Sequence, residues 1–600
     1  MTSTSPTSVT ILLGPATQTT TPASGHSVTV ERPLSDSRAA TVIEQLTEVR
    51  TALAAGSRVI VIATDLIAPS AALAPVTDDA FAPTTTLLAP DRTGRVTVRH
   101  HTVVSAGSSF HDVRTPSHSS VGALVIAPQD CVVAADAVDE LLQALSHGDV
   151  SVPDDDAFDV LLVALVRGGV PVRAVDIVDV PWFRTVHDQG GAWDSVGSVS
   201  EARVRGLLAN RVDDGFYSTF VVRKASKPLT RLAIRLGWSP NAITLVSFGV
   251  GLAAAASFVG GSFWWLLAGA LLLQLSLVID CVDGEVARAT RRFSSLGAWL
   301  DAATDRVKEF AAYAGLAMGA ARFGIDVWWI AVVLVVLQTT RHMSDYDFAR
   351  IQRLREATAP RADVRDPEDP LPQGAGALAS AMQTSARINR RSAVRWFKKV
   401  IHLPIGERWL ILSVLAVVAG PQWALGGLLV AGALALLYVL AGRIARTLTW
   451  AGATPGDGAQ VLRDQWDAGP IAAGIARVVP ALRPSAAGRF AWSLPVALRA
   501  LELGGIALLV ALSDPSLVVA AFWVLFVIAY HHYDNLYRSL QGASPPRWLT
   551  WAGFGWDGRL AIVAALAITS LWNPTITVLL VWWAVLFGGI ASVQWLRSKR

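Results

Sequence analysis

Residues 280–305 read DCVDGEVARATRRFSSLGAWLDAATD, and this stretch sets the interpretation of the whole chain. Its first acidic cluster follows the spacing i, i+3, i+4 and i+7 of one helix face: Asp280, Asp283, Gly284 and Ala287. Its second cluster repeats every four residues, again on one face: Gly297, Asp301 and Asp305. Each cluster adjoins a strongly apolar segment, so two helices are expected to turn four carboxylates toward each other.

Carboxylates beside a membrane are costly unless they face the interior of a helix bundle or a polar cavity. Four of them together also repel one another unless a cation neutralises them. Hard oxygen ligands of this kind suit Mg2+ or Mn2+. The pattern therefore predicts a divalent-metal site between two helices. The alternative interpretation is that the four aspartates only cap helix ends at the membrane surface.

The stretch resembles the signature of the CDP-alcohol phosphotransferase (CDP-alcohol phosphatidyltransferase) family, D-x2-D-G-x2-A-R-x8-G-x3-D-x3-D. Every fixed position of the signature is present: Asp280, Asp283, Gly284, Ala287, Arg288, Gly297, Asp301 and Asp305. The resemblance implies an enzyme that transfers a phosphoalcohol from a CDP-alcohol to an acceptor hydroxyl and releases CMP. Such reactions make phospholipids or inositol-type phosphodiesters.

The resemblance also implies roles for individual residues. Two divalent ions are expected, with these metal ligands: Asp280, Asp283, Asp301 and Asp305. Asp305 is in addition the expected general base for the acceptor hydroxyl. The expected nucleotide-binding residues combine small side chains with a cation for the diphosphate: Gly284, Ala287, Arg288, Gly297, Asn241 and Thr244.

A phosphorylated acceptor would need a second basic pocket near the acidic clusters. The candidates for this acceptor-phosphate site are Arg341 and Lys308, with Arg306 beside them. The alternative interpretation is that each of these side chains is an anchor at a helix end. Relatives with an α/β domain in front of the membrane core join CDP-inositol to inositol phosphate, which favours a polar, inositol-type donor or acceptor here.

Residues 1–200 are expected to form a soluble α/β domain. Apolar runs at 9–14, 59–64 and 122–128 predict buried strands, and the patterns at 39–56 and 135–145 predict helices. Their alternation predicts a parallel sheet with helices on both faces. The layout resembles the nucleotidyltransferase domain that precedes the membrane core in some relatives.

This N-terminal domain is expected to be a degenerate, non-catalytic nucleotidyltransferase. The first strand is followed by GPATQTTTPASG (14–25), which lacks the basic, Gly-rich character of a triphosphate loop. No lysine precedes Lys224. Asp65 and Asp130 follow strands and are candidate metal ligands, although aspartates at strand ends are common without a metal.

A basic linker, residues 201–240, leads into the membrane domain. Its segment KPLTRLAIRLG predicts an amphipathic helix that lies on an anionic membrane surface, with a solvated linker helix as the alternative. The linker ends at a Pro-Asn-x-x-Thr motif, with Asn241 and Thr244, which resembles a motif near the nucleotide site of the family.

The rest of the chain predicts an all-α polytopic membrane bundle of about ten helices. Hydrophobic residues make up 52% of the 600 residues, and the 22 tryptophans suit membrane interfaces. The expected six-helix core, residues 241–450, contains six apolar segments: 242–259, 262–280, 303–321, 326–340, 408–420 and 423–442. A C-terminal extension, residues 455–600, contains four more: 496–512, 515–531, 558–572 and 575–595.

Positive charge predicts the orientation in the cell membrane. Lys and Arg flank the connection between the fourth and fifth apolar segments: Arg341, Arg350, Arg353, Arg355, Arg390, Arg391, Arg395, Lys398, Lys399 and Arg408. Such loops stay in the cytoplasm, and parity then places the acidic motif and the N-terminal domain there. The first residues lack a basic region followed by an apolar one, so no signal peptide is expected.

The C-terminal extension carries a short polar group within apolar sequence: His531, His532, Tyr533, Asp534 and Arg538. It predicts either a metal or phosphate site, or polar residues at a boundary between helix and water. Cys131 and Cys281 give no disulfide framework.

The expected partners are a CDP-alcohol donor, a polar or phosphorylated alcohol acceptor and membrane lipid. The net charge of +4 does not point to nucleic acid. Members of the family often form homodimers, which makes a homodimer an expectation for this chain. Two other functions compete with the enzyme: a catalytically inactive membrane scaffold or sensor that keeps the fold, and a transporter that couples ions through its carboxylates.

Overall fold

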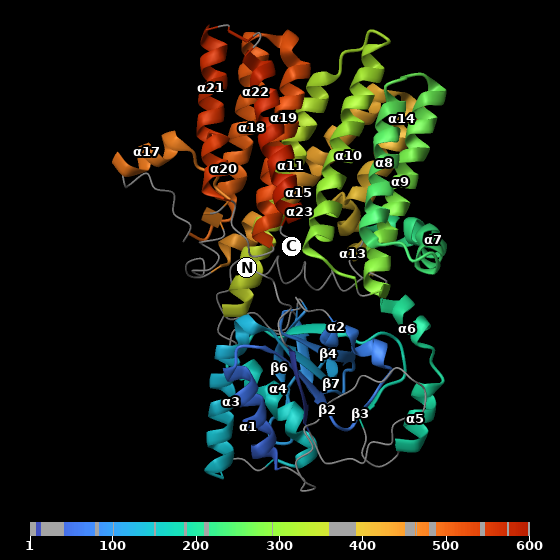
Figure 1. Cartoon of the computed structure of the whole chain (residues 1–600), viewed down its shortest axis with the longest axis vertical. Coiled ribbons are helices and arrows are strands. Elements are labelled where there is room, and N and C mark those ends of the chain that lie inside the picture. The colour runs from blue at the N-terminus through green and yellow to red at the C-terminus, as the bar shows by residue number, and fades with distance from the viewer. Residues whose placement is uncertain are drawn as a thin grey trace. The chain divides into compact units, whose positions relative to one another are not determined.

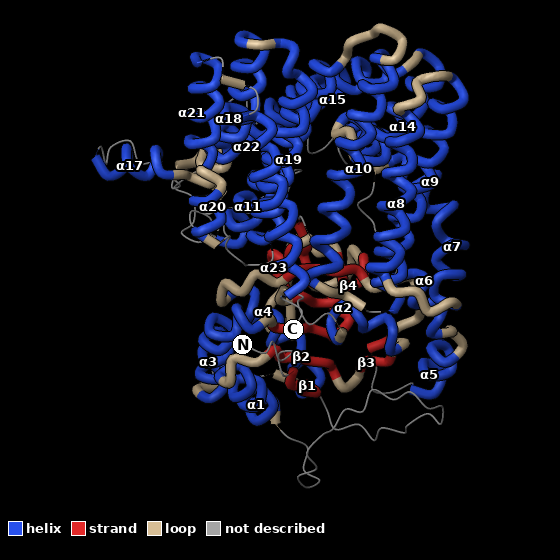
Figure 2. Tube along the Cα trace, turned by 45° about the horizontal axis from the view of Figure 1, so that its top comes forward, coloured by secondary structure: helices blue, strands red, loops and turns tan. Residues whose placement is uncertain are grey.

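The structure is a computed structural model that forms two compact units, the first built mainly from residues 1–211. The units are described separately (Figure 1). The structure describes these residues: 8–13, 41–78, 83–99, 101–148, 152–184, 189–208, 215–290, 292–358, 392–450, 462–463, 465–478, 488–540, 546–569, 571–572 and 575–597. Figure 2 shows that the strands lie in the first unit, whereas the second is helical.

The first unit is built on one seven-stranded sheet with the order β1-β2-β7-β4-β8-β6-β5. Its strands are β1 (Ser8–Leu13), β2 (Arg58–Ala63), β4 (Thr85–Pro90), β5 (Val96–Arg99), β6 (Thr102–Ala106), β7 (His118–Ile126) and β8 (Arg173–Asp176). A separate antiparallel pair joins β3 (Leu66–Ile67) to β9 (Phe183–Arg184).

The expectation of a parallel sheet is wrong, because the sheet is mixed. β1 runs parallel to β2, and β4 runs parallel to β8. β7, however, runs antiparallel to both β2 and β4, with Val59 opposite Ile126. The chain passes from β4 through β5 and β6 to β7 without an intervening helix, and only antiparallel neighbours allow such short connections.

Three helices cover one face of the sheet and bury its main core: α1 (Val42–Ala54), α3 (Cys131–Ser146) and α4 (Ala157–Arg167). α1 begins with a capping box, in which Thr41 and Glu44 each bond the backbone N–H of the other. The short α2 (Ala74–Thr77) lies over the smaller core of the other face. α5 (Gln189–Gly197) and α6 (Glu201–Leu208) follow the sheet.

The second unit begins with a π-helical turn, η4 (Ser218–Val222), and the basic α7 (Arg223–Arg235). The helices that follow up to residue 450 are α8 (Pro240–Phe258), α9 (Phe263–Thr290), α10 (Ser295–Ala321), α11 (Trp328–Thr358), α13 (Ser392–Ile401), α14 (Ile405–Ala419) and α15 (Pro421–Leu448). The later ones are α17 (Pro470–Val478), α18 (Ser493–Ser513), α19 (Val518–Leu540), α20 (Arg547–Ala552), α21 (Gly555–Thr569), α22 (Thr575–Trp583), η8 (Ala584–Ile590) and α23 (Ala591–Arg597).

Among the described residues, seven helices are long and apolar enough to cross a membrane: Pro240–Phe258, Phe263–Thr290, Pro421–Leu448, Ser493–Ser513, Pro515–Leu540, Arg547–Thr569 and Thr575–Trp595. All ten apolar segments expected from the sequence fall on helices, but α10, α11 and α14 are not in this set. α14 has only 15 residues, and α10 carries a run of charged residues between Asp301 and Glu309. Ten spans therefore stay a prediction.

In the second unit, helices α8 and α10 pack closely against each other. A Cβ atom on Gly315 would lie 2.2 Å from the carbonyl oxygen of Ala255, and one on Gly319 would lie 2.2 Å from that of Phe258. The two backbones therefore approach as closely as small residues permit in membrane helices. This contact brings the first turns of α8 beside the acidic motif on α9 and α10.

Candidate active site

The structure brings three carboxylates of the motif together. Asp280 extends from α9, and Asp301 and Asp305 extend from successive turns of α10. One oxygen of each lies within 4.8 Å of those of the other two. Three hard oxygen donors at such spacing fit a divalent cation, in agreement with the interpretation of the two helix faces.

The fourth carboxylate of the motif, Asp283, is held by a neighbouring helix. It is 5% exposed and accepts a hydrogen bond of 2.5 Å from Thr244 Oγ1 on α8. Thr244, expected at the nucleotide, thus contacts a predicted metal ligand. Its Oγ1 also lies 3.1 Å from the carbonyl oxygen of Pro240, in the first turn of α8.

Lys308 lies between the carboxylates rather than in a separate pocket. Its Nζ is 2.6 Å from Asp280 Oδ1, 3.0 Å from Asp305 Oδ1 and 3.0 Å from Ser247 Oγ. The side chain is fully buried and lies over the ring of Trp409 at 5.3 Å. A buried ammonium in this place offsets half of the negative charge of the two carboxylates.

Sequence reasoning assigned Lys308 to the acceptor and missed Ser247. A signal was present for both residues. Lys308 follows Asp305 by three positions and so shares its helix face, and Ser247 follows Thr244 by the same interval. Ser247 Oγ lies 3.1 Å from Asp280 Oδ1, so it completes the contacts around this carboxylate.

The start of α10 lies against the start of α8. A Cβ atom on Gly297 would lie 2.8 Å from Asn241 Oδ1, so glycine lets the Asn241 amide reach the α10 backbone. Ser294 caps α10 by accepting a hydrogen bond from the Gly297 N–H at 2.9 Å. The other expected nucleotide residues, Gly284, Ala287 and Arg288, lie partly exposed on the last two turns of α9.

The other cations predicted for the acceptor phosphate take part in buried contacts. Arg341 donates to the carbonyl oxygens of His402 and Leu403, just before α14. Arg306 pairs with Glu309 at 2.7 Å, and Glu309 also pairs with Arg408 at 2.6 Å. Because these guanidinium groups already bind protein partners, they fit structural roles better than the binding of an acceptor phosphate.

A second cluster of possible ligands lies in the C-terminal extension. Asp467, His531 and His532 have ligand atoms within 4.8 Å of one another. Arg559 pairs with Asp467 and with Glu502, each at 2.6 Å. Arg499 also pairs with Glu502, so two guanidinium groups balance the two carboxylates. The positive charge of an added divalent cation would find no uncompensated negative charge in this buried cluster. We therefore interpret the cluster as a structural ion-pair network.

The polar group at 531–538 does not lie at a boundary with water. Four of its members are almost completely buried: His531, His532, Tyr533 and Asp534. The expectation of a solvent boundary is wrong because partners far away in sequence, such as Glu502 and Asp467, surround these side chains.

The two aspartates singled out in the N-terminal domain have protein partners. Arg184 Nε lies 2.7 Å and 2.8 Å from the two oxygens of Asp65. Asp130 accepts a hydrogen bond of 2.5 Å from Thr84 Oγ1, and burial raises its pKa above the ordinary value. These partners favour structural roles. The loop GPATQTTTPASG (14–25) lies outside the described residues.

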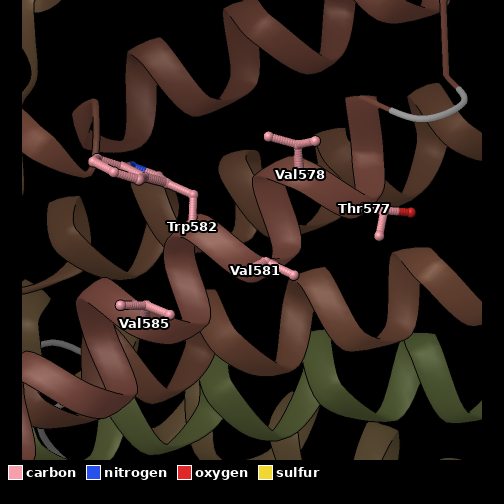
Figure 3. Close-up of a pocket in the computed structure, with 5 residues that line it drawn as sticks. All are labelled: Thr577, Val578, Val581, Trp582 and Val585. Carbon is pink, nitrogen blue, oxygen red and sulfur yellow. The ribbon is translucent and has the colours of Figure 1, made fainter.

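A cavity of about 380 Å³ on α22 and η8 is chemically unlike the acidic cluster (Figure 3). Its lining is Thr577, Val578, Val581, Trp582 and Val585. It offers no charged group to a diphosphate, so its size does not make it the reaction site.

Two family models match the chain. Residues 238–386 match the family described as CDP-alcohol phosphatidyltransferase. Residues 468–598 match a family of unknown function (DUF5941). The first match contains every residue of the acidic motif, and the second contains most of the C-terminal extension.

Curated proteins with similar sequences are named synthases and transferases. The phosphatidylinositol phosphate synthase of Mycobacteroides abscessus is 32% identical over 170 residues, which are 28% of this chain and 74% of that protein. The protein of the same name from Mycolicibacterium smegmatis is 33% identical over 130 residues, 22% of this chain and 57% of that protein. The bifunctional IPC transferase and DIPP synthase of Aquifex aeolicus is 36% identical over 107 residues, 18% of this chain and 24% of that protein.

Proposed function

The chain belongs to the CDP-alcohol phosphatidyltransferase family, and we propose that it transfers a phosphoalcohol from a CDP-alcohol to an acceptor hydroxyl. CMP is the other product. The observation that carries the proposal is the gathering of Asp280, Asp301 and Asp305 on two packed helices, in a family match that includes the complete motif.

The donor set supports a divalent metal, proposed as two ions of Mg2+ or Mn2+. Asp280, Asp301 and Asp305 offer grouped oxygens, and Asp283 lies one helical turn from Asp280. A bound ion would supply positive charge to the diphosphate and to the departing CMP. The protein contributes the rigid carboxylate positions, which the contacts of Thr244 and Ser247 hold in place.

In the proposed reaction, the acceptor oxygen attacks the phosphorus that carries the alcohol, and the bond from this phosphorus to the CMP oxygen breaks. Asp305 takes the proton of the acceptor hydroxyl as general base. The Lys308 ammonium, 3.0 Å from Asp305 Oδ1, holds this carboxylate in one orientation. The proton stays on Asp305 until product release returns it to water.

The nucleotide is proposed to lie beside the small residues at the ends of α9 and α10. Asn241 and Gly297 support this because they meet closely without a side chain between the helices. Gly284 and Ala287 leave the last turns of α9 open to a ligand, and Arg288 offers a cation to the diphosphate.

An inositol-type substrate is the proposed chemistry of the transferred or accepting alcohol. The synthases from M. abscessus and M. smegmatis bear phosphatidylinositol phosphate in their names. The family model covers the motif-bearing part of this chain, residues 238–386. Arg341, Arg306 and Lys308 have protein partners, so the acceptor phosphate is proposed to use cations elsewhere at the mouth of the site.

We propose a cell-membrane protein with ten spans, with the N-terminal domain and the motif on the cytoplasmic side. Seven apolar helices and the Lys and Arg residues that flank the 340–408 connection support this topology. Part of that connection, residues 359–391, lies outside the described residues.

The N-terminal domain is proposed to lack nucleotidyltransferase activity. Its candidate metal ligands Asp65 and Asp130 have partners in Arg184 and Thr84, as described above. The full chain, incubated with CTP, Mg2+ and inositol phosphate, is therefore expected to release no pyrophosphate. Pyrophosphate release above that of a heat-inactivated sample would contradict this assignment.

The substrate proposal is tested with purified full-length protein in detergent with Mg2+. CDP-diacylglycerol, CDP-inositol and CDP-glycerol are each combined with inositol phosphate, inositol or glycerol phosphate, and CMP is measured. One inositol-containing pair is expected to give the fastest release. Release only from pairs that contain no inositol would reject the inositol assignment, and absence of CMP with every pair would favour the inactive scaffold.

A further inference from the structure

Helix α10 presents two different sets of side chains on its opposite faces. The face toward α9 holds the acidic site: Asp301, Asp305 and Lys308. The other face holds residues spaced by three or four positions: Trp299, Ala302, Arg306 and Phe310. This second face contacts the C-terminal helix α19, for example through Phe310 and Phe526, whose rings are 5.6 Å apart.

Asp534 on α19 joins three helices. Its Oδ1 accepts hydrogen bonds from the indole N–H of Trp299 on α10 at 3.0 Å and from that of Trp595 on α23 at 2.7 Å. The two indoles stack with centroids 5.4 Å apart. Arg538 donates to the other oxygen, Oδ2, at 2.8 Å, so the buried carboxylate is paired with a cation and both of its oxygens accept hydrogen bonds.

A second chain of contacts runs from α19 toward the proposed base. The hydroxyl of Tyr533 lies 2.7 Å from His342 Nδ1 on α11. The same nitrogen lies 3.1 Å from an Arg306 nitrogen, and the Arg306 guanidinium lies over the Tyr533 ring at 5.8 Å. Arg306 in turn approaches Asp305 Oδ2 at 3.9 Å.

These contacts matter because α10 supplies two of the three grouped carboxylates. A binding site works only if its ligands are held to within about 0.5 Å, and the supporting shell determines whether they are. Asp534 holds Trp299, which is two residues before Asp301, and Trp299 is only 5% exposed. A shift of α10 at Trp299 would therefore move Asp301 relative to Asp280.

We propose that the C-terminal bundle clamps α10 and positions Asp301 and Asp305, with Asp534 as the principal positioning residue. The inference rests on the proposed function and gives a role to the region that matches a family of unknown function. Asp534 does not touch the carboxylates themselves; it acts through Trp299 and the α10 backbone.

The test compares the full-length protein with Asp534→Ala and with a control, Asp514→Ala. Asp514 caps the 3-10 turn η7 (Pro515–Leu517) before α19, in the same bundle. Two quantities are measured: the dissociation constant of Mn2+ from titration of free Mn2+ by electron paramagnetic resonance, and kcat for CMP release at saturating metal. Asp534→Ala is expected to weaken Mn2+ binding and to lower kcat, each by about tenfold or more, the range found for outer-shell partners of metal ligands.

In the Asp514→Ala control, the Mn2+ dissociation constant and kcat are expected to stay within about twofold of the wild-type values. Asp514 shares no contact with the carboxylates of the acidic site, and effects of distant sites are independent. A folded Asp534→Ala protein with wild-type Mn2+ affinity and wild-type kcat would overturn the proposal. So would an equal loss in the Asp514→Ala control, because general loosening of the bundle would then suffice.

Two further variants serve if Asp534→Ala does not fold. Trp299→Phe keeps the aromatic packing but removes the indole N–H, and Asp534→Asn keeps an acceptor oxygen but removes the charge. Trp299→Phe is expected to weaken Mn2+ binding more than Asp534→Asn does, and the reverse order would contradict the clamp through Trp299. Because Mn2+ affinity is measured without substrate, the clamp can be judged even if no CMP is released by the wild type.

Discussion

At the residue scale, Lys308 distinguishes this site from a bare cluster of carboxylates. Its ammonium contacts Asp280 and Asp305, the residues to which a metal ion would also be attracted. A fixed positive charge about 4 Å from a divalent cation repels it by up to about 8 kcal/mol at an effective dielectric constant of about 20, twice the repulsion between two unit charges. Lys308 would therefore compete with a metal ion for the carboxylates that it contacts.

Replacing Lys308 by methionine should separate this competition from the orienting contact with Asp305. Lys308→Met is expected to bind Mn2+ about tenfold more tightly, because the competing charge is gone, and to lose about tenfold or more in kcat, because Asp305 loses its orienting contact. Lys227→Met on the exposed face of α7 is the matched control and should change neither quantity. Weaker Mn2+ binding in Lys308→Met would refute the role as a competing cation.

The sequence allowed the acidic faces to be predicted because helix periodicity alone aligns Asp280 with Asp283, and Asp301 with Asp305. It did not reveal what Lys308 contacts. Periodicity gives the face of a residue but not the partner across the helix interface, and here the partner comes from α9. The same limit applies to Arg341, whose contacts are carbonyl oxygens about sixty positions later in the chain.

At the scale of elements, a buried ion-pair network joins α10 to α14. Glu309 is fully buried, and its carboxylate is shared by Arg306 and Arg408 with bonds of 2.7 Å and 2.6 Å. The hydroxyl of Tyr313 donates to the same carboxylate at 2.9 Å. Charged side chains thus hold together α10 and α14, two helices that are not among the seven that are long and apolar enough to cross a membrane.

The substitution Glu309→Gln tests how much this ion-pair network stabilises the protein. The substitution leaves the Arg408 guanidinium buried without a counter-charge and leaves Arg306 with only Asp305, 3.9 Å away. Removing the partner of a buried charge costs about 3–5 kcal/mol. We expect a clear decrease in the thermal unfolding temperature in detergent. The double variant Glu309→Met/Arg408→Met should recover part of that loss, and a double variant less stable than Glu309→Gln would argue against the charge-pairing explanation.

The strand directions of the first unit show a further limit of prediction from sequence. The runs at 59–64 and 122–128 were correctly expected to be strands, because short apolar runs bounded by turn residues favour them. Such runs are buried on both faces whether their neighbours are parallel or antiparallel. The antiparallel position of β7 between β2 and β4 is set by tertiary pairing, which the apolar pattern does not encode.

At the scale of the whole molecule, the topology is a separate hypothesis that labelling can test. With ten spans, the turn before α9 faces outward while the N-terminal domain faces the cytoplasm. Exposed serines offer cysteine positions on each side: Ser262 in that turn and Ser198 after α5. The two native cysteines, Cys131 and Cys281, would be replaced by serine in the parent protein.

A membrane-impermeant maleimide added to intact cells should label Ser262→Cys and leave Ser198→Cys unlabelled. After lysis both positions should react, which controls for the exposure of Ser198→Cys. Labelling of Ser198→Cys in intact cells, with protection of Ser262→Cys, would invert the topology and place the acidic motif away from cytoplasmic CDP-alcohols.

The central claim is that the grouped aspartates on α9 and α10 release CMP from a CDP-alcohol. The most direct measurement is Mg2+-dependent CMP release by the wild type, by Asp301→Asn and by the control Asp326→Asn. Asp326 only caps the start of α11, where it accepts a hydrogen bond from the Trp328 N–H at 3.0 Å. The account predicts release by the wild type and Asp326→Asn and a loss of at least about a hundredfold in Asp301→Asn; equal release by all three proteins would contradict it.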